Sequence, residues 1–242
     1  EFNLVVTNIA PSDAEITLWN GSVEITDDRN PPIWDVMEDQ VVTLKGTAHD
    51  SLNDMDSLTW GWQPDVDVDP NWYVETVGET SEINISWNSS GSHVIAMEAI
   101  DNDGESSGVA SGWVRVLNVA PTVEQFDPLL PLGEDRDLTL TGVFTDTTSD
   151  METLQVCWDV DFEVDFDENG DTMDDCDFVG ADITHHWADS GEKTIRFHVT
   201  DDDGDSAEAI VIVNVVNLKP NAAAHAEKST IQVGEELVIW TN

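Results

Sequence analysis

The sequence predicts an all-β protein made of two successive antiparallel β-sandwich domains, and three observations support this fold class. A pattern of residues recurs after about 100 positions, strand-like segments alternate with a period of two, and clusters of Gly, Ser, Asp and Asn separate them. Short strands with regular turns over a stretch of this length are typical of sandwich domains. No segment of useful length has a helical period.

The internal repeat is the strongest of these observations, because self-similarity at a fixed period is the signature of a repeat architecture. In the first part of each repeat the offset is 96 residues: Glu38-Asp39 recurs as Glu134-Asp135, and Trp62 recurs as Trp158. In the second part the offset is 100 residues. There the matching segments are Trp87 to Gly91 with Trp187 to Gly191, and Asp101 to Gly104 with Asp201 to Gly204.

A junction motif, Asn-x-x-Pro, divides the chain into domains. It ends at Pro11, Pro121 and Pro220, and each time it follows a Val-rich run. We therefore expect the last strand of a preceding repeat, two complete domains and the first strands of a further repeat, at residues 1–11, 12–120, 121–219 and 220–242. The alternative is that the two terminal pieces complete each other between subunits by strand addition.

The strands and the cores can be read from the apolar residues. Ile195, Phe197 and Val199 alternate with polar residues, which is the pattern of a half-buried strand. The last strand of the second repeat, Val211 to Val216, is nearly continuous in apolar residues. Ten Trp and seven Phe provide enough apolar surface for packed cores, so the chain is not expected to be disordered.

These residues resemble the PKD (polycystic kidney disease) domain family over nearly the whole chain. The features that carry the resemblance are a Trp in the third strand, an aromatic-x-x-x-Gly segment, an alternating strand and an Asp-x-x-Gly turn. The family's usual Trp-Asp-Phe-Gly-Asp-Gly is replaced at Trp62 and Trp158, so the middle of each domain is expected to differ. The resemblance implies tandem immunoglobulin-like sandwiches that act as spacers or adhesive units of archaeal or bacterial surface proteins and secreted hydrolases.

The charge of the chain excludes two classes of partner. It has 51 acidic and 8 basic residues, a formal net charge of −43. Nucleic acid is excluded because binding it depends on Lys and Arg, and an anionic membrane surface is excluded by the same sign. A charge this large requires high salt or bound divalent cations, and general solubilisation in a saline habitat is the alternative to specific sites. No run of residues is long and apolar enough for a membrane helix.

The cysteines and the sequons indicate an oxidising compartment outside the cell. Cys157 and Cys176 form an even, local pair, for which we expect a disulfide; two free buried thiols are the alternative. N-x-S/T sequons occur at Asn20, Asn84 and Asn88, where we note candidate glycosylation sites. We therefore expect a secreted or cell-surface protein.

Two groups of residues are predicted to bind calcium near the linkers. In an immunoglobulin-type sandwich, the entering linker, the loop between the second and third strands and the last hairpin loop share one end. This geometry gathers a first linker cluster and a second linker cluster, in which converging oxygens suit calcium and which the PKD resemblance also implies. Alternatively, the hairpin Asp residues only shape their turns. The first cluster is Asn8, Asp50, Asp54 and Asp101, and the second is Asn118, Asp146, Asp150 and Asp201.

A further candidate is a calcium loop in the second repeat. Asp165, Asp167, Asn169 and Asp171, with Gly170, match the first positions of a calcium-binding loop. Cys176 stands where the closing Glu is expected, so the closing ligand would come from Asp174, Asp175 or Asp177. Repeat one has a weaker version without the glycine at Asp65-x-Asp67-x-Asp69. A solvated acidic loop is the alternative.

The function predicted from these patterns is a non-enzymatic, extracellular structural or adhesive repeat module that structural calcium rigidifies. No catalytic residue and no organic cofactor are expected. The partners would be neighbouring repeats of the same array, other copies of the chain or surface glycans. One alternative is a carbohydrate-binding module of a secreted hydrolase, in which Trp19, Trp34 and Trp72-Tyr73 stack on sugars. Another is a self-assembling subunit of a surface layer or filament.

Overall fold

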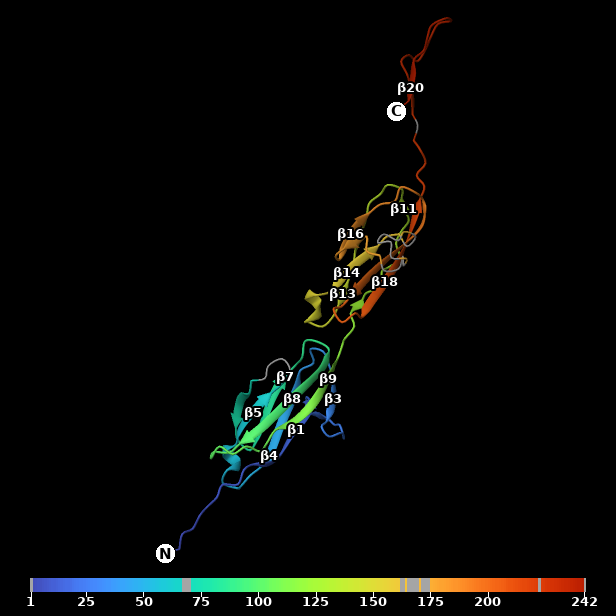
Figure 1. Ribbon diagram of the computed structural model, residues 1–242. Helices are drawn as coiled ribbons and strands as arrows, with labels where there is room; N and C mark the ends of the chain where they lie inside the picture. The colour runs from blue at the N-terminus through green and yellow to red at the C-terminus, as the bar shows by residue number, and fades with distance from the viewer. Residues whose placement is uncertain are drawn as a thin grey trace. The chain divides into compact units, whose positions relative to one another are not determined.

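The computed structural model describes residues 2–66, 71–161, 164, 170, 175–221 and 223–241. The chain divides into two compact units (Figure 1). Unit 1 comprises Glu1–Thr122, Phe144–Gln155 and Val199–Ala207, and unit 2 comprises Val123–Val143, Val156–His198 and Glu208–Asn242. Two loop segments of the second repeat, 144–155 and 199–207, therefore group with unit 1. The boundaries read from the repeat remain a prediction.

The first repeat is a sandwich of two sheets (Figure 1). The four-stranded sheet contains, in spatial order, β2 (Val23–Ile25), β1 (Ser12–Asn20), β4 (Val42–His49) and β7 (Thr80–Ile85). The five-stranded sheet contains, in spatial order, β3 (Ile33–Met37), β9 (Ala110–Leu117), β8 (Gly91–Ile100), β5 (Thr59–Gln63) and β6 (Tyr73–Val77). The strands pair antiparallel except β3 and β9, which are parallel.

The core of the first repeat lies between these sheets and is built around tryptophans. Trp60 and Trp62 of β5 are fully buried, and each indole N–H has a partner: Gly78 O at 2.8 Å and Ser81 Oγ at 2.9 Å. Buried Tyr and Trp side chains usually require such a partner for their polar atom. Gly46 on β4 leaves room for these rings, because a Cβ there would lie 3.0 Å from Trp62 Cζ2.

The second repeat has the same strand order in its five-stranded sheet, but its two edge strands are shorter. Its five-stranded sheet contains β11 (Leu132–Gly133), β18 (Ser206–Val216), β17 (Gly191–Thr200), β14 (Gln155–Asp159) and β15 (Phe178–Val179). β11 and β18 are parallel, as β3 and β9 are in the first repeat. The remaining strands form two pairs, β12 (Leu138–Thr141) with β16 (Asp182–His185) and β10 (Thr122–Val123) with β13 (Phe144–Thr145).

The core of unit 2 is built around Trp158 and Phe197, whose ring centroids are 4.5 Å apart. Both side chains are fully buried. Gly142 occupies the position that Gly46 has in the first repeat, and a Cβ on it would overlap the Phe197 ring. The same small residue is therefore required in both cores, for a tryptophan in one and a phenylalanine in the other.

The predicted fold class is confirmed: the chain is all-β, with tandem antiparallel sandwiches. Among the described residues the helical elements are two short 3₁₀ turns, Met55–Ser57 and Asp150–Glu152. Ile195, Phe197 and Val199 are buried as expected, but Arg196 between them is only 7% exposed, so the alternation fails at that residue. No helix in the described part of the chain is long and apolar enough to cross a membrane.

The loop that follows β3 and β11 has the same backbone in both repeats. Asp39 and Asp135 have positive φ angles of 56° and 55°, a conformation that Asp adopts more readily than most residues. Each donates its N–H to a buried tryptophan carbonyl at 2.9 Å, Trp87 O for Asp39 and Trp187 O for Asp135. This bond fixes the Glu-Asp pair of the repeat at the end of the sandwich.

The terminal segments lie outside both sandwiches. Residues 2–11 form no strand. β19 (Ala224–Ala226) and β20 (Ile239–Thr241) pair antiparallel with each other. The expected partial repeats at both ends, and the alternative of completion between subunits, stay predictions.

Candidate functional site

In the first linker cluster a hydrogen bond joins the linker to the hairpin loop. Asn8 donates its side-chain amide to Asp101 Oδ2 at 2.7 Å, and Asp101 is 4% exposed. The other oxygen, Asp101 Oδ1, accepts two backbone N–H groups of its own turn. Asp54 accepts a hydroxyl bond from Ser51 at 2.6 Å. Asp50 Oδ2 is buried with no hydrogen-bond partner among the described residues.

The second linker cluster repeats this arrangement. Asn118 donates to Asp201 Oδ2 at 2.9 Å, and Asp201 is 3% exposed. Asp150, also 3% exposed, accepts a bond from Thr147 Oγ1 at 2.8 Å. Asp146 Oδ1 accepts the N–H of Thr147, whereas Asp146 Oδ2 and Asn118 Oδ1 are buried without a partner in the described part of the chain. All eight residues of the two clusters belong to unit 1.

The electrostatics of the two clusters follow from these contacts. The amide bond from Asn8 and the backbone N–H groups of the turn lower the pKa of the Asp101 carboxyl, and so favour its charged form. Burial raises the pKa of Asp146, and the charges of Asp150 and Asp201 act in the same direction. The hydrogen bonds that the alternative interpretation expected are therefore present, since Asp101 and Asp201 do shape their turns. Within the described part of the chain, these bonds leave Asp50 Oδ2 and Asp146 Oδ2 unpaired.

Sequence reasoning missed Glu38, which lies beside the second linker cluster in unit 1. Glu38 is 4% exposed, and its Oε2 has no hydrogen-bond partner among the residues described. Burial raises the pKa of Glu38 to about 7, and the charges of Asp150, Asp203 and Asp202 contribute. Its neighbour Asp39 accepts the backbone N–H of Ser149 at 2.9 Å. The signal was present, because Glu38-Asp39 opens the repeat motif.

Three carboxylates of unit 2 lie closer together than those of either linker cluster. Among the described residues, Asp159, Asp161 and Asp177 are the one group of three or more His, Cys, Asp or Glu whose ligand atoms all lie within 4.8 Å of one another. We call them the strand-end cluster, because Asp159 ends β14 and Asp177 immediately precedes β15. The sequence analysis named Asp177 and missed the other two.

Most of the predicted calcium loop lies outside the described residues: Asp165, Asp167, Asn169, Asp171 and Asp174. Of its proposed closing residues, Asp175 is 3% exposed and Asp177 belongs to the strand-end cluster. In the first repeat Asp67 and Asp69 are also outside the described residues, whereas Asp65 is paired with His93 Nδ1 at 2.8 Å.

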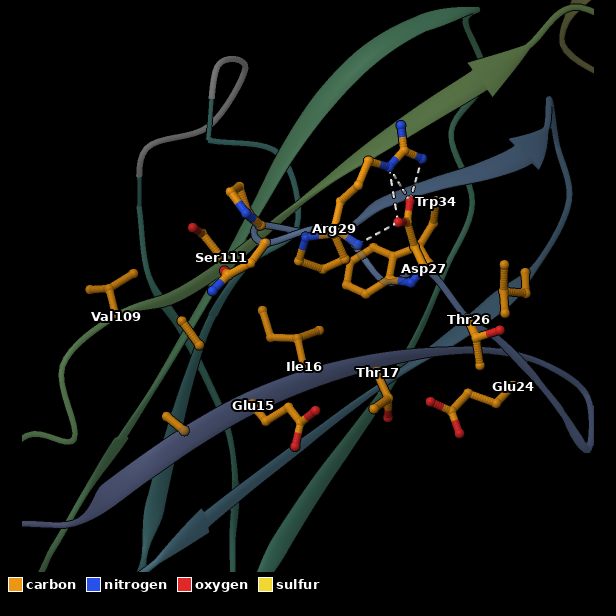
Figure 2. A pocket seen from close by; sticks show the side chains of 16 residues that line it. Glu15, Ile16, Thr17, Glu24, Thr26, Asp27, Arg29, Trp34, Val109 and Ser111 are labelled. Atoms are coloured by element: carbon orange, nitrogen blue, oxygen red, sulfur yellow. Dashed lines mark hydrogen bonds and ion pairs between the residues drawn. The ribbon is translucent and has the colours of Figure 1, made fainter.

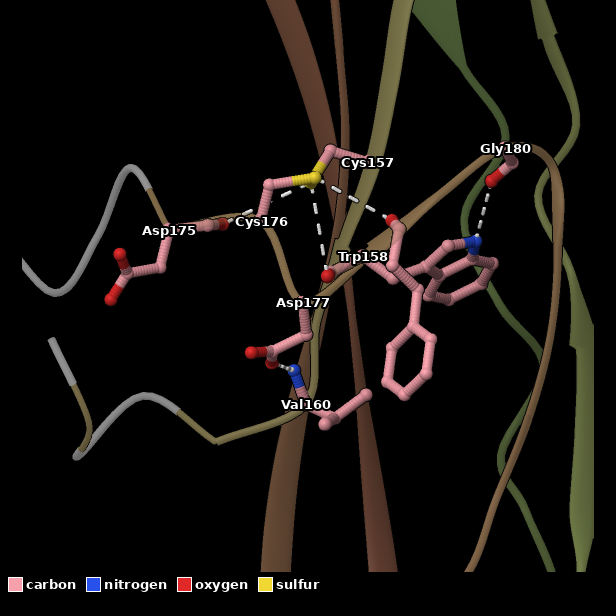
Figure 3. The surroundings of a disulfide bond; sticks show 8 residues. Cys157, Trp158, Val160, Asp175, Cys176, Asp177 and Gly180 are labelled. Carbon is pink, nitrogen blue, oxygen red and sulfur yellow. Dashed lines mark hydrogen bonds between the residues drawn. A yellow bond between two sulfur atoms is a disulfide. The ribbon is translucent and has the colours of Figure 1, made fainter. Parts of the chain in front are cut away.

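The expected disulfide is present between Cys157 and Cys176, with a Cα–Cα distance of 5.5 Å (Figure 3). Cys157 is buried on β14 and Cys176 lies two residues before β15, so the bond joins β14 to the segment that leads into its neighbouring strand. The alternative of two free thiols is therefore wrong.

The aromatic residues that could stack on sugars do not form an open row. Trp34 is 3% exposed, beside a cavity of about 550 Å³ whose wall carries the Asp27–Arg29 ion pair (Figure 2). Trp19 is half-buried with Lys45 Nζ 4.8 Å from its ring centroid. Trp72 is 38% exposed. The three sequon asparagines, Asn20, Asn84 and Asn88, are all exposed, and their glycosylation remains a prediction.

The strand order and the buried tryptophans define the class of the protein: tandem immunoglobulin-like β-sandwich domains, the fold that the PKD resemblance implied. No protein-family model and no curated protein matches the chain. Among solved structures it is similar to the PKD domain of an M14-like peptidase from a Thermoplasmatales archaeon. The identity is 15% and the TM-score 0.34, over 46% of this chain and 98% of that one.

Two further solved structures are similar over more of the chain. The titin domains Z1Z2, in complex with telethonin, have 12% identity and a TM-score of 0.44, over 88% of this chain and 100% of that one. The fibronectin(III)-like modules of Clostridium thermocellum CbhA have 17% identity and a TM-score of 0.29, over 78% of this chain and 94% of that one. At such scores the fold class rests on the chain's own strands.

Proposed function

We propose that this chain is an extracellular structural or adhesive module of a cell-surface protein, and that calcium bound at its linker clusters rigidifies it. The observation that carries the proposal is that both repeats present the same arrangement. In each, a linker asparagine binds the buried hairpin aspartate, and Asp50 Oδ2 or Asp146 Oδ2 is left buried without a hydrogen bond among the described residues. A buried carboxylate oxygen without a partner is costly, and a hard cation would satisfy it.

The mechanism follows from the elements that the clusters join. In the first cluster, one ion would connect the entering linker to the β4–β5 loop and to the β8–β9 hairpin. In the second cluster, the corresponding loops are β13–β14 and β17–β18. Calcium accepts six to eight oxygen ligands in flexible geometry, so amide, carboxylate and water oxygens can complete the shell. The ion would offset carboxylate repulsion in a chain of net charge −43 and would order the linker.

Thermal unfolding of residues 1–242 tests this proposal. It should be measured in millimolar calcium, in matched magnesium and in chelator, all at constant high ionic strength. Occupation at 100 times the Kd stabilises by about 2.7 kcal/mol, which corresponds to a rise of about 10 °C or more for a domain of this size. The charge-neutral variants D50N and D146N should each lose the calcium response of one cluster.

The control for these variants is D56N, which removes an exposed carboxylate of the 3₁₀ turn after Asp54. It should retain the full calcium response. Equal melting temperatures in calcium, magnesium and chelator would contradict the proposal and would leave general solubilisation as the role of the acidic residues.

The two alternative functions predict other outcomes. Burial of Trp34 disfavours a coplanar sugar-binding row, and a sugar-binding module would bind insoluble polysaccharide in a pull-down that Trp72→Ala abolishes. A self-assembling subunit would sediment as a concentration-dependent oligomer. The proposed module, whose partners are neighbouring repeats of one array, should sediment as a monomer.

A further inference from the structure

The strand-end cluster is assembled from two chain segments that the sheet brings together. Asp159 is the last residue of β14, Asp161 lies two residues further on, and Asp177 precedes β15, the antiparallel neighbour of β14. Asp177 donates its N–H to Trp158 O at 2.9 Å, and its Oδ2 accepts the N–H of Val160 at 2.8 Å (Figure 3). The backbone therefore holds the Asp177 carboxylate over the end of β14.

The centre of the cluster is a buried carboxylate that is only half satisfied. Asp159 is 1% exposed. Its Oδ1 accepts the N–H of Asp161 at 3.1 Å, and its Oδ2 has no hydrogen-bond partner among the described residues. Leaving a charged oxygen buried without a partner costs more than leaving a neutral polar group so. Asp161 and Asp177 cannot supply the missing partner while ionised, because carboxylates only accept hydrogen bonds.

The same positions of the first repeat carry different residues. Gln63 stands where Asp159 is, and it pairs across the sheet with Ala96, where the second repeat has Arg196. Asp65 stands where Asp161 is, but it has His93 Nδ1 at 2.8 Å as a partner, and the second repeat has Lys193 at that position. The second repeat therefore adds carboxylates here rather than removing them.

The charges around the cluster leave room for a divalent cation. Burial raises the pKa of Asp159, and the charge of Arg196 opposes this rise. Asp159, Asp161, Asp177 and Arg196 together carry a formal charge of about −2 when all are ionised. Glu192 and Lys193, which line the cavity that Asp161 borders, cancel each other in this count. His185 also faces the group, and burial lowers the pKa of its ring. Asp161 borders a cavity of about 600 Å³, which gives water and ions access.

We propose that Asp159, Asp161 and Asp177 form a calcium site of the second repeat, separate in its residues from both linker clusters. Two oxygens on one calcium ion, bound at about 2.4 Å each, can be up to about 4.8 Å apart, whereas the limit for magnesium is about 4.2 Å. The oxygens of this cluster all lie within 4.8 Å of one another, which is within the span that oxygens sharing one calcium ion can have. The all-carboxylate donor set favours a hard cation over zinc.

Terbium luminescence tests this site, since Tb³⁺ replaces Ca²⁺ and indole rings within a few ångströms sensitise its emission. Trp158 is adjacent to Asp159, and Trp187 lines the same cavity as Asp161. The titration should use residues 1–242 with the D50N/D146N substitutions, in which both linker clusters are altered. We expect saturable emission that excess calcium displaces, and a loss of at least tenfold in affinity for Asp161→Asn. The matched control Asp65→Asn, at the same position of repeat one, should bind as before.

Thermal melts distinguish a metal ligand from a structural residue. Asp161 is exposed, so its replacement by Asn is not expected to prevent folding. In chelator, D161N should melt at or above the parent protein, because a repelling carboxylate is gone. In calcium it should melt below the parent.

Three results would overturn the site. They are an equal loss of stability for D161N in both conditions, terbium emission that D161N leaves unchanged, and calcium binding only above 10 mM. If only the linker proposal fails, calcium should raise the melting temperatures of the wild type and of D50N/D146N by the same amount. The terbium signal of the strand-end cluster should then remain intact.

Discussion

The two repeats solve the same structural problem differently where the third strand meets its neighbours. In the first repeat, Gly61 on β5 lies beneath the Trp72 ring; a Cβ on Gly61 would be 3.1 Å from Trp72 Cε3. In the second repeat the same position is Cys157, and its disulfide with Cys176 covers the strand. The first repeat therefore uses an aromatic ring where the second uses a covalent bond.

The difference continues two residues along the strand. Repeat one has the neutral Gln63 and the Asp65–His93 pair, whereas repeat two has three clustered carboxylates near Arg196. The positions that determine the sandwich are the same in both repeats, namely the core tryptophan, the close-packed glycine and the Glu-Asp pair. The residues at the sheet edge formed by β6 or β15 differ between the repeats, which indicates that this edge can change its covalent and charged contacts without changing the sandwich.

Removal of the disulfide should have the largest effect. The bond closes a loop with a sequence separation of 19 residues, for which the chain-entropy treatment gives about 3 kcal/mol. We expect C157A/C176A to lose about this much free energy of unfolding in urea titrations followed by fluorescence. Trp72→Ala in repeat one is the comparison variant. A C157A/C176A protein with unchanged stability would contradict the idea that the bond replaces the packing of Trp72.

Replacement of the core glycine by Ala should destabilise the two repeats to different extents. Gly142→Ala would force its Cβ into the Phe197 ring, and we expect a loss of about 2–3 kcal/mol from overpacking. Gly46→Ala should cost less, because its Cβ would meet Trp62 and Trp60 at 3.0 and 3.1 Å. Urea denaturation of both variants measures the difference. A larger loss for Gly46→Ala would contradict this prediction.

In chelator, the free energy of unfolding should depend on pH through the protonation of Glu38. Its pKa is about 7 in the folded protein, raised from 4.5 by burial and then by Asp150 and other neighbours. Between these values the folded state holds a proton that the unfolded state has released, so stability falls as the pH rises from about 4.5 to 7. The loss should be on the order of 1–2 kcal/mol, and E38Q should abolish it. Parallel pH profiles for E38Q and wild type would contradict the assignment.

The smallest effect is expected at the Asp65–His93 contact of repeat one. Asp65 and His93 are half-buried, and Asp65→Asn should cost about 1 kcal/mol or less. This loss should be the same in calcium and in chelator, whereas the effect of Asp161→Asn should depend on calcium. Differential scanning calorimetry in both conditions measures the contrast. A calcium-dependent D65N would show that the two positions are equivalent after all.

Much of the fold could be predicted from the sequence because its signals are local or repeated. Trp62 and Trp158 mark the core strand by recurrence alone, and the period of two around Ile195 and Phe197 marks a half-buried strand. The contact between Asn118 and Asp201 was predicted because the entering linker and the last hairpin loop lie at the same end of an immunoglobulin-type sandwich. Each of these inferences needed only spacing and fold class.

The remaining features depend on proximity that spacing does not encode. Burial raises the pKa of Glu38, and the charges of Asp150 and Asp203 add to this rise. Both aspartates lie more than 100 residues further along the chain. Asp161 was overlooked because acidic residues are abundant, and abundance hides the few that a sheet brings together. Arg196 breaks the alternation of its strand because it lies near the buried charge of Asp159.

The parallel pairing of β3 with β9, and of β11 with β18, has a mechanical consequence. When a repeat is pulled by its ends, two parallel strands slide along each other once the load reaches them, so their hydrogen bonds are loaded together in shear and not one after another. In repeat one, β3 and β9 are in register from Ile33–Trp113 to Met37–Leu117. In repeat two, only Leu132–Val215 and Gly133–Val216 of β11 and β18 are so paired. Under tension this shear contact should therefore yield first in the second repeat, and the disulfide would then limit how far the released chain extends.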